Sequence, residues 1–164
     1  MALALSVERY LIKSGIRYGV MTHHPTEFSM ATVHAAGIPA RRLAKSVVLR
    51  DEAGYLIAVV PASHRLRLGS LHVQLRRPLG LATESELRSL FTDCEPGAIP
   101  PLGQAYGLRV IVDDILIVQP EIYFEGGDHQ ELIQVAGADF QRLLSGALHG
   151  RFSFLSLEGA SPLH

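Results

Sequence analysis

Apolar runs alternate along this chain with polar stretches rich in turn residues. The boundaries between them predict where helices begin and end. A first helix is predicted over 6–14, with Ser6 as its N-cap and Gly15 as the residue that ends it. Thr83 and Glu86 have the spacing of a capping box, which marks the start of another helix. The predicted helices are 6–14, 29–36, 68–75, 83–91 and 138–144, with a short turn at 39–43.

Other segments carry the β-branched and apolar residues that favour strands. The clearest pair is 45–50 and 55–60, which the turn Asp51–Gly54 joins into a predicted hairpin. Further strands are predicted at 18–22, 108–112, 115–118, 122–124 and 131–135. Because strands outnumber strand–helix alternations late in the chain, we expect an α+β fold with a mixed, mostly antiparallel sheet and peripheral helices. No linker or repeat divides residues 1–164, which predicts one domain.

Composition narrows the class of protein. Hydrophobic residues make up 48% of the chain and the mean hydropathy is positive, which predicts a well-filled core. No apolar run reaches the roughly 18 residues of a membrane helix, so no membrane partner is expected. The apolar start of the chain lacks a basic region, so we expect no signal peptide. A single cysteine, Cys94, excludes an internal disulfide and a CxxC metal site, in keeping with a reducing cytoplasm.

The charge pattern leaves two interpretations open. A net charge of -1 argues against a bulk nucleic-acid binder, and we expect no DNA partner. The basic residues are nevertheless clustered, in the groups Arg41, Arg42 and Lys45, then Arg65 and Arg67, then Arg76 and Arg77. These groups are either ordinary solvated surface or a local patch that contacts the phosphates of a short stretch of RNA.

Lys45 is unusual in its position. The chain has 15 basic residues, of which only Lys13 and Lys45 are lysines, and Lys45 opens the apolar run Ala44–Leu49. A lysine at the start of a buried strand commonly extends its ammonium group to water. A desolvated ammonium group, however, shifts its pKa readily and can serve chemistry. Position alone favours the first interpretation.

The segment Gly97–Pro101 is a second candidate for chemistry. Gly97 permits backbone conformations closed to other residues, whereas Pro100 and Pro101 fix φ and stiffen the end of the loop. A rigid loop holds its backbone N–H groups at fixed points, where they can polarise a carbonyl and stabilise an oxyanion. The pattern G-x-x-x-P is weak evidence by itself, because many surface turns contain it.

Five segments in a fixed order resemble one known family. They are 44–49 (AKSVVL), 58–61 (AVVP), 81–87 (LATESEL), 97–103 (GAIPPLG) and 112–114 (VDD). Together they resemble the YbaK/ProX family of free-standing aminoacyl-tRNA deacylases, relatives of the editing domain of bacterial prolyl-tRNA synthetases. The resemblance covers about residues 18–144. It implies a curved mixed sheet of about six to seven strands, partly closed into a barrel, with helices outside.

The resemblance also implies an activity: hydrolysis, in trans, of the ester that joins a wrong amino acid to the 3′ end of a tRNA. Lys45 corresponds to the lysine that members need. It would hold a terminal phosphate or ribose oxygen. The loop that binds the substrate carbonyl corresponds to Gly97, Ala98, Ile99, Pro100 and Pro101. Backbone N–H groups of Ala98 and Ile99 would stabilise the oxyanion while a water attacks, so Lys45 and the loop are expected to face one cleft.

The resemblance implies no cofactor, and it names mischarged tRNA as the transient partner, with an aminoacyl-tRNA synthetase as a further candidate. Leu102 stands where relatives carry an aromatic residue after the prolines, so the lining of the pocket can differ. A binding module without turnover, for aminoacylated tRNA 3′ ends or a small amino-acid-like ligand, is the main alternative. A regulatory protein that docks onto a synthetase is another.

Substrate-binding residues are expected in two further places. Phe28 and Met30 lie where relatives place part of the pocket wall, although such residues more often belong to a core. Gly127, Asp128 and His129 border the pocket in the same comparison, although a hairpin turn with polar tips explains them slightly better. His23, His24 and His129 lack the spacing of a metal site, so no metal is expected. We interpret Cys94 as structural, because no histidine base lies near it in sequence.

Overall fold

The computed structural model describes residues 3–26 and 29–156. Its strands are β1 (Gly19–Thr22), β2 (Leu43–Asp51), β3 (Gly54–Pro61), β4 (His64–Leu66), β5 (Gly80–Leu81), β6 (Arg109–Asp113), β7 (Glu121–Glu125), β8 (Glu131–Ala136), β9 (Leu148–Gly150) and β10 (Ser153–Leu155). Its helices are α1 (Leu5–Ser14), α2 (Ser29–Ala36), α3 (Leu68–Leu75), α4 (Glu84–Leu90), α5 (Asp114–Ile117) and α6 (Gly137–Leu143), with 3-10 turns η1 (Ala40–Arg42) and η2 (Gly103–Tyr106).

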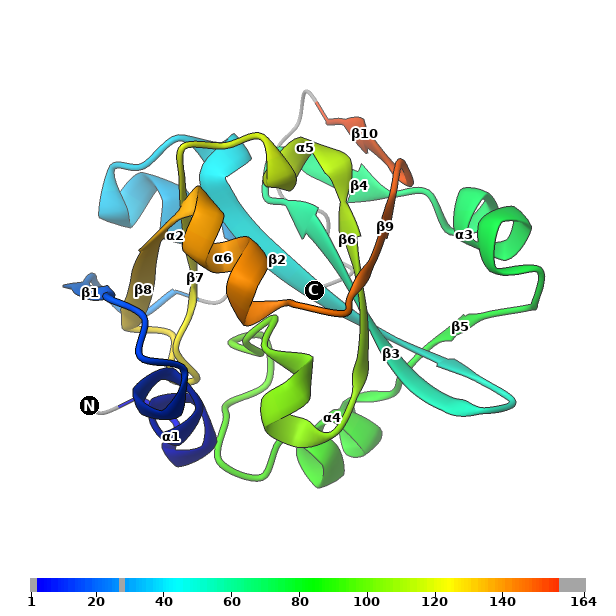
Figure 1. Ribbon diagram of the computed structural model, residues 1–164, viewed down its shortest axis with the longest axis horizontal. Helices are drawn as coiled ribbons and strands as arrows, with labels where there is room; N and C mark the ends of the chain where they lie inside the picture. Colours follow the sequence, from blue (N-terminus) through cyan, green and yellow to red (C-terminus); the bar gives the residue numbers. More distant parts are fainter. Residues whose placement is uncertain (1–2, 27–28, 157–164) are drawn as a thin grey trace.

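A curved mixed sheet organises the fold (Figure 1). The strand order is β1-β8-β7-β2-β3-β6-β9, and β5 pairs with β2 outside this path. The pairs β2–β7, β3–β6 and β6–β9 are parallel, and the other pairs in this sheet are antiparallel. A separate antiparallel pair joins β4 to β10. The expected mixed, mostly antiparallel sheet is therefore confirmed, with more short edge strands than predicted.

The hairpin of β2 and β3 is buried on both faces because its apolar residues do not alternate with polar ones. Successive side chains of a strand point to opposite faces, so the two strands feed two cores. Ala44, Val48, Ile57 and Val59 belong to the larger core. Val47, Leu49, Leu56, Ala58 and Val60 belong to the smaller core on the other face. A strand of this kind forms the centre of a layered domain.

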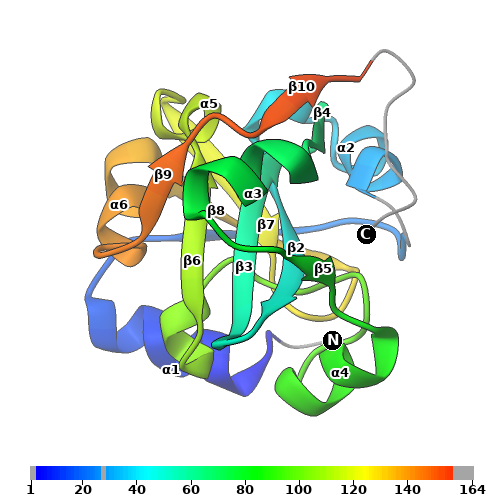
Figure 2. The ribbon, with the colours of Figure 1, turned by 90° about the vertical axis from the view of Figure 1, so that its right-hand side faces the viewer.

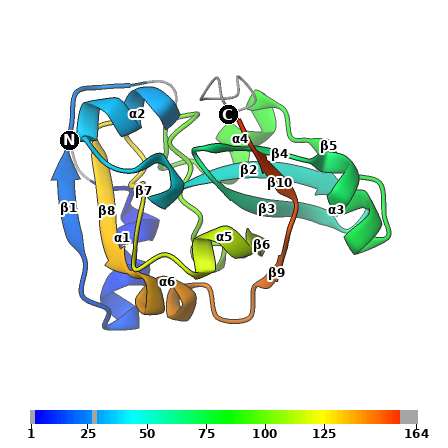
Figure 3. The same ribbon diagram turned by 90° about the horizontal axis from the view of Figure 1, so that it is seen from above.

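Helices cover both faces of the sheet. The larger core receives buried residues from α1, α4, α5 and α6. On the other face α3 lies across β3 and β6, with Leu71 fully buried (Figure 2). Helix α2 lies away from α3, towards the β1 and β8 side of the molecule, and its Val33 packs with Leu43, Tyr123 and Leu132 (Figure 3). None of the helices in the described part of the chain is long and apolar enough to cross a membrane.

One edge of β2 changes partner along its length. The first residues of β2 pair with β7, where Leu43 and Ala44 face Tyr123 and Phe124. The last residues pair with β5, in the register Leu49 to Leu81 and Arg50 to Gly80. Between these two pairings, no described strand pairs with this edge from Lys45 to Val47. The sheet therefore has a gap beside a strand that is otherwise central.

Several sequence predictions of local structure are confirmed. The hairpin has the predicted partners, and Thr83 and Glu86 form the capping box of α4. Gly15 ends α1 with φ 69°, as predicted, but the N-cap is Ala4 rather than Ser6. The Ser6 N–H instead donates to Asp93 Oδ2 at 2.8 Å, a contact between distant segments that propensity cannot reveal.

The predicted strand at 115–118 is wrong. Residues 114–117 form α5, because the Asp113 side chain accepts a hydrogen bond from the Ile115 N–H and caps the helix. The same carboxylate accepts from the Phe152 N–H at 3.1 Å and the Ser153 hydroxyl at 2.8 Å, although Asp113 is only 1% exposed. Asp113 thus ties the segment leading to β10 to the end of β6. Tertiary contacts overrode the strand propensity of Ile115–Val118.

We predict that Asp113→Ala lowers the free energy of unfolding by about 2–4 kcal/mol, because three donors lose a buried, charged acceptor. Urea unfolding at pH 7 measures the loss. Asp114→Ala is the matched control: Asp114 is half-exposed and pairs with His149, so its loss should cost under about 1 kcal/mol. Equal effects of the two substitutions would contradict the structural role of Asp113.

Candidate functional site

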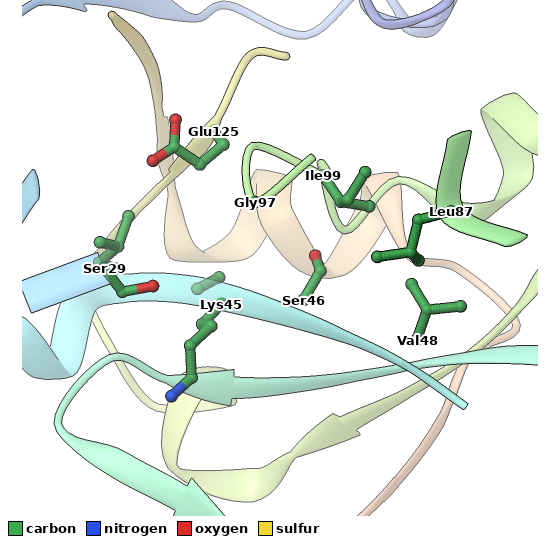
Figure 4. Close-up of a pocket in the computed structure, with 10 residues that line it drawn as sticks. Ser29, Lys45, Ser46, Val48, Leu87, Gly97, Ile99 and Glu125 are labelled. Carbon is green, nitrogen blue, oxygen red and sulfur yellow. The ribbon is translucent and has the colours of Figure 1, made fainter. Parts of the chain in front are cut away.

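The gap beside β2 is occupied by a pocket. It has an empty volume of about 410 Å³, which includes space open to solvent. Its lining residues come from α2, β2, α4, β7 and the loop after α4: Ser29, Leu43, Ala44, Lys45, Ser46, Val48, Leu87, Gly97, Ile99 and Glu125. Sequence segments about fifty residues apart, at Lys45 and Gly97, therefore meet at one place (Figure 4).

Main-chain polar groups of β2 line this gap. The Leu43 carbonyl accepts from the Ala62 N–H just beyond β3, whereas the Val48 carbonyl accepts from the Ala82 N–H just beyond β5. Because alternate residues of a strand direct N–H and C=O to opposite edges, Ser46 shares the edge of Val48. The main-chain groups of Ser46 therefore face the pocket rather than β3.

Lys45 lines the pocket, but its ammonium group points away from Gly97 and Ile99 (Figure 4). The residue is 6% exposed, and Nζ donates to the His64 carbonyl at 3.2 Å. Burial lowers the pKa of Lys45 to about 8, and the neighbouring charge of Arg65 contributes to this shift. The segments of Lys45 and Gly97 meet at one pocket, but the expectation that the ammonium group faces the loop is wrong, because Nζ lies on the other side of β2 and donates to the His64 carbonyl.

The Gly97–Pro101 loop is rigid and largely buried. Gly97 has φ 85°, a conformation that favours glycine, and Ala98, Ile99, Pro100 and Pro101 are all buried. The Ala98 N–H donates to the Glu95 carbonyl at 3.0 Å, so it is not available for an oxyanion. The N–H groups of Gly97 and Ile99 have no acceptor among the described residues. Of the two donors expected from the sequence, Ile99 remains.

Gly127, Asp128 and His129 support this loop and are not among the residues that line the pocket. The Gly127 carbonyl accepts from the Glu95 N–H at 2.8 Å, and His129 Nε2 contacts the Pro96 carbonyl at 2.6 Å. Asp128 Oδ1 accepts from the N–H groups of Gln130 and Glu131, which shapes the turn between β7 and β8. These residues hold the chain directly before Gly97.

The other predicted pocket wall is placed in part. Phe28 lies outside the described residues. Met30 packs against the core formed by α2 with β7 and β8, so it is a core residue and not part of the pocket wall. Its neighbour Ser29 lines the pocket instead.

Sequence reasoning missed two buried polar residues of the pocket, Ser46 and Glu125, as well as the half-buried Ser29. Ser46 and Glu125 are each 8% exposed. Ser46 Oγ and Glu125 Oε2 have no hydrogen-bond partner among the described residues. Burial raises the pKa of Glu125 to about 8, and the nearby Asp128 charge adds to the shift. A glutamate that ends the apolar strand 122–124 was the available signal, of the same kind as the lysine that opens 44–49.

Several arginines of the predicted basic clusters have structural contacts. Arg42 pairs with Glu121, Arg77 pairs with Asp51, and Arg67 lies over the Phe154 ring. Arg65 is half-buried and acts on Lys45. Lys45 on β2 and Arg65 on β4 thus interact electrostatically, whereas Arg42 and Arg77 form ion pairs.

Cys94 and the histidines carry no chemistry that the geometry favours. Burial raises the pKa of Cys94 to about 12, so its thiol is inert near neutral pH. His23 Nδ1 contacts the His24 carbonyl, and His129 Nε2 contacts the Pro96 carbonyl. No group of three or more metal-binding side chains occurs within 3–26 and 29–156.

Comparison with known proteins now gives the class. Residues 23–143 match the family described as the aminoacyl-tRNA editing domain. This span exceeds half of the 164 residues, so the chain belongs to that family, and the resemblance to YbaK/ProX deacylases is confirmed.

Individual relatives agree with this assignment. The proline–tRNA ligases of Xanthomonas oryzae pv. oryzae (strain MAFF 311018) and Xanthomonas axonopodis pv. citri (strain 306) are 34% and 33% identical over 82 residues. That match covers 47% of this chain and only 14% of each ligase.

Solved structures show the same fold over nearly the whole chain. A proposed trans-editing enzyme for prolyl-tRNA synthetase has a TM-score of 0.80 at 26% identity, covering 93% of this chain and 99% of that one. The hypothetical protein APE2540 has a TM-score of 0.80 at 23% identity, covering 91% and 99%.

We predict that Lys45→Met stabilises the protein at pH 7 by on the order of 1–3 kcal/mol. Folding lowers the pKa of Lys45 from 10.5 to about 8, so below pH 8 both states are charged and the folded state bears the full desolvation cost. The cost fades as pH rises from 8 to 10.5, because the folded state loses its proton first. Chemical unfolding at pH 7 and pH 10.5 measures both values. A variant less stable than wild type at pH 7 would contradict the assigned burial cost.

Proposed function

We propose that this protein hydrolyses the ester of mischarged aminoacyl-tRNA in trans. The observation that carries the proposal is the pocket in the sheet gap, where the strand of Lys45 meets the Gly97–Pro101 loop. Membership of the aminoacyl-tRNA editing family supports the substrate, and the likeness to a proposed trans-editing enzyme for prolyl-tRNA synthetase supports action as a separate protein.

In this proposal the aminoacyl group enters the pocket and the ester carbonyl faces the loop. The free N–H of Ile99, with that of Gly97, stabilises the negative charge that develops on the carbonyl oxygen. Water attacks the carbonyl carbon, the bond to the ribose oxygen breaks, and that oxygen takes a proton. Free amino acid and intact tRNA are the products. Ala98 contributes to the rigidity of the loop rather than as a donor.

Lys45 acts on the nucleotide rather than on the carbonyl. Its ammonium lies on the other side of β2 from Ile99 and within electrostatic reach of Arg65. Two cations there suit a terminal phosphate or a ribose oxygen and would fix the ester over the pocket. Positioning of this kind commonly supplies several kcal/mol of rate acceleration, and an ester needs no metal or covalent nucleophile to react.

The partner in this reaction is the 3′ acceptor end of a tRNA, in the cytoplasm where charged tRNA occurs. A synthetase is a further candidate partner, since the curated relatives are proline–tRNA ligases. A binding module without turnover would use the same pocket, and the difference lies in release of free amino acid.

We predict that Lys45→Ala lowers the rate of amino-acid release from mischarged tRNA by about 100-fold or more, because the ester is no longer positioned. A panel of mischarged tRNAs, assayed for release of labelled amino acid, provides the measurement. Lys13→Ala is the matched control: it removes the other lysine, which is exposed on α1, and should leave the rate within about twofold of wild type.

Two outcomes would contradict the proposal. Wild-type protein that leaves every mischarged tRNA of the panel intact has no deacylase function. A folded Lys45→Ala variant with the wild-type rate would remove Lys45 from the mechanism.

A further inference from the structure

Glu125 lines the pocket and carries a buried carboxyl group. It ends β7 and is 8% exposed. Oε1 accepts a hydrogen bond from the Thr32 hydroxyl at 3.3 Å, whereas Oε2 is buried without a partner among the described residues. The residue therefore retains one oxygen whose hydrogen-bonding capacity only a bound molecule or water can satisfy.

Neither protonation state removes this deficit. When ionised, Oε2 is a buried acceptor without a donor, and when protonated it is a buried donor without an acceptor. No described cation compensates the charge, because the charged neighbour that acts on Glu125 is Asp128, and Lys45 directs its ammonium to the His64 carbonyl. The missing group is thus a donor to the ionised carboxylate or an acceptor for the protonated acid, and of these a cationic donor satisfies both the hydrogen bond and the charge.

The two ends of the pocket differ in chemistry. Ser29 and Glu125 lie at one end, Val48 and Leu87 at the other, and Ser46 lies between them (Figure 4). Ile99 adds to the apolar end. Ser46 Oγ is a second buried polar atom without a partner among the described residues. A ligand with an ammonium group beside a small apolar group would match both ends.

We propose that Glu125 is a specificity-determining residue that binds the α-ammonium group of the aminoacyl ester, an inference that rests on the deacylase function proposed above. A primary ammonium has three donors. One reaches Glu125 Oε2, and the hydroxyl group of Ser29, at the same end of the pocket, can accept another. The side chain of the amino acid then lies towards Val48, Leu87 and Ile99. The substrate class is an aminoacyl ester with a free α-amine, and esters with a blocked or missing amine are excluded.

Binding of two non-hydrolysable analogues tests this proposal without turnover. Both are acceptor-stem minihelices that end in 3′-amino-3′-deoxyadenosine, one acylated with alanine and the other with lactic acid. They differ only in an α-ammonium against an α-hydroxyl group. Wild-type protein should bind the alanyl analogue at least about tenfold more tightly, because the lactyl analogue leaves the buried carboxyl group without a cation. Glu125→Gln should reduce this preference to within about threefold.

Two controls separate recognition from structure. Glu84→Gln makes the same change on the exposed face of α4 and should keep the wild-type preference. Glu125→Gln should unfold at a temperature equal to or above that of wild type, because it removes a buried carboxyl group that has no cationic partner. With labelled alanyl and lactyl esters, Glu125→Gln should raise KM for the alanyl ester alone and leave kcat within about threefold.

The outcomes are distinct. Wild-type protein that does not distinguish the analogues, or a Glu125→Gln variant that retains the preference, would overturn the assignment. If Glu125→Gln weakens the binding of both analogues equally, or lowers the melting temperature, Glu125 has a structural role, and this result would also overturn the assignment. Selective binding of the alanyl analogue by a protein that leaves esters intact would support the subsite and contradict only the deacylase function.

Discussion

The architecture of this site depends on one break in hydrogen-bond pairing. Strand β2 is central in the sheet, yet between its pairing with β7 and its pairing with β5 no strand of residues 3–26 and 29–156 pairs with one of its edges. Main-chain polar groups in a protein interior must find partners, and a substrate can provide them where a strand does not. The pocket, the Gly97 loop and the two buried ionisable residues all adjoin this gap.

The loop that closes the gap is held from outside the pocket. Gly127 and His129 bind the chain at Glu95 and Pro96, directly before Gly97. With this support, the Ala98 N–H stabilises the turn itself, and the N–H groups of Gly97 and Ile99 have no acceptor in the part of the chain that the structure describes. A donor fixed in this way needs no reorganisation when charge develops on a substrate, which is the property that makes such loops effective.

Two buried ionisable residues flank the gap, and each is desolvated. Burial lowers the pKa of Lys45 and raises that of Glu125, so both charged forms are disfavoured in the folded protein. They do not pair with each other, since Lys45 bonds to His64 and Glu125 to Thr32. Both groups are desolvated, and they lie on opposite sides of one strand. This arrangement suits a ligand that carries opposite charges at its two ends. An aminoacylated nucleotide does so, with an ammonium group at one end and phosphate at the other.

Local chemistry in the sequence determined much of the fold. The apolar runs of β2 and β3, the turn between them and the Thr83–Glu86 capping box are local signals, and the structure follows them. The resemblance to a known family, read from five segments, indicated the class and the residues of the loop. Tertiary structure decided the rest. Asp113 made a helix of a predicted strand by capping it, and the His64 carbonyl drew the Lys45 ammonium away from the loop. Glu125 and Ser46 became pocket residues only where two distant strands diverge, because unpaired buried oxygens are a property of the assembled core and not of any one segment.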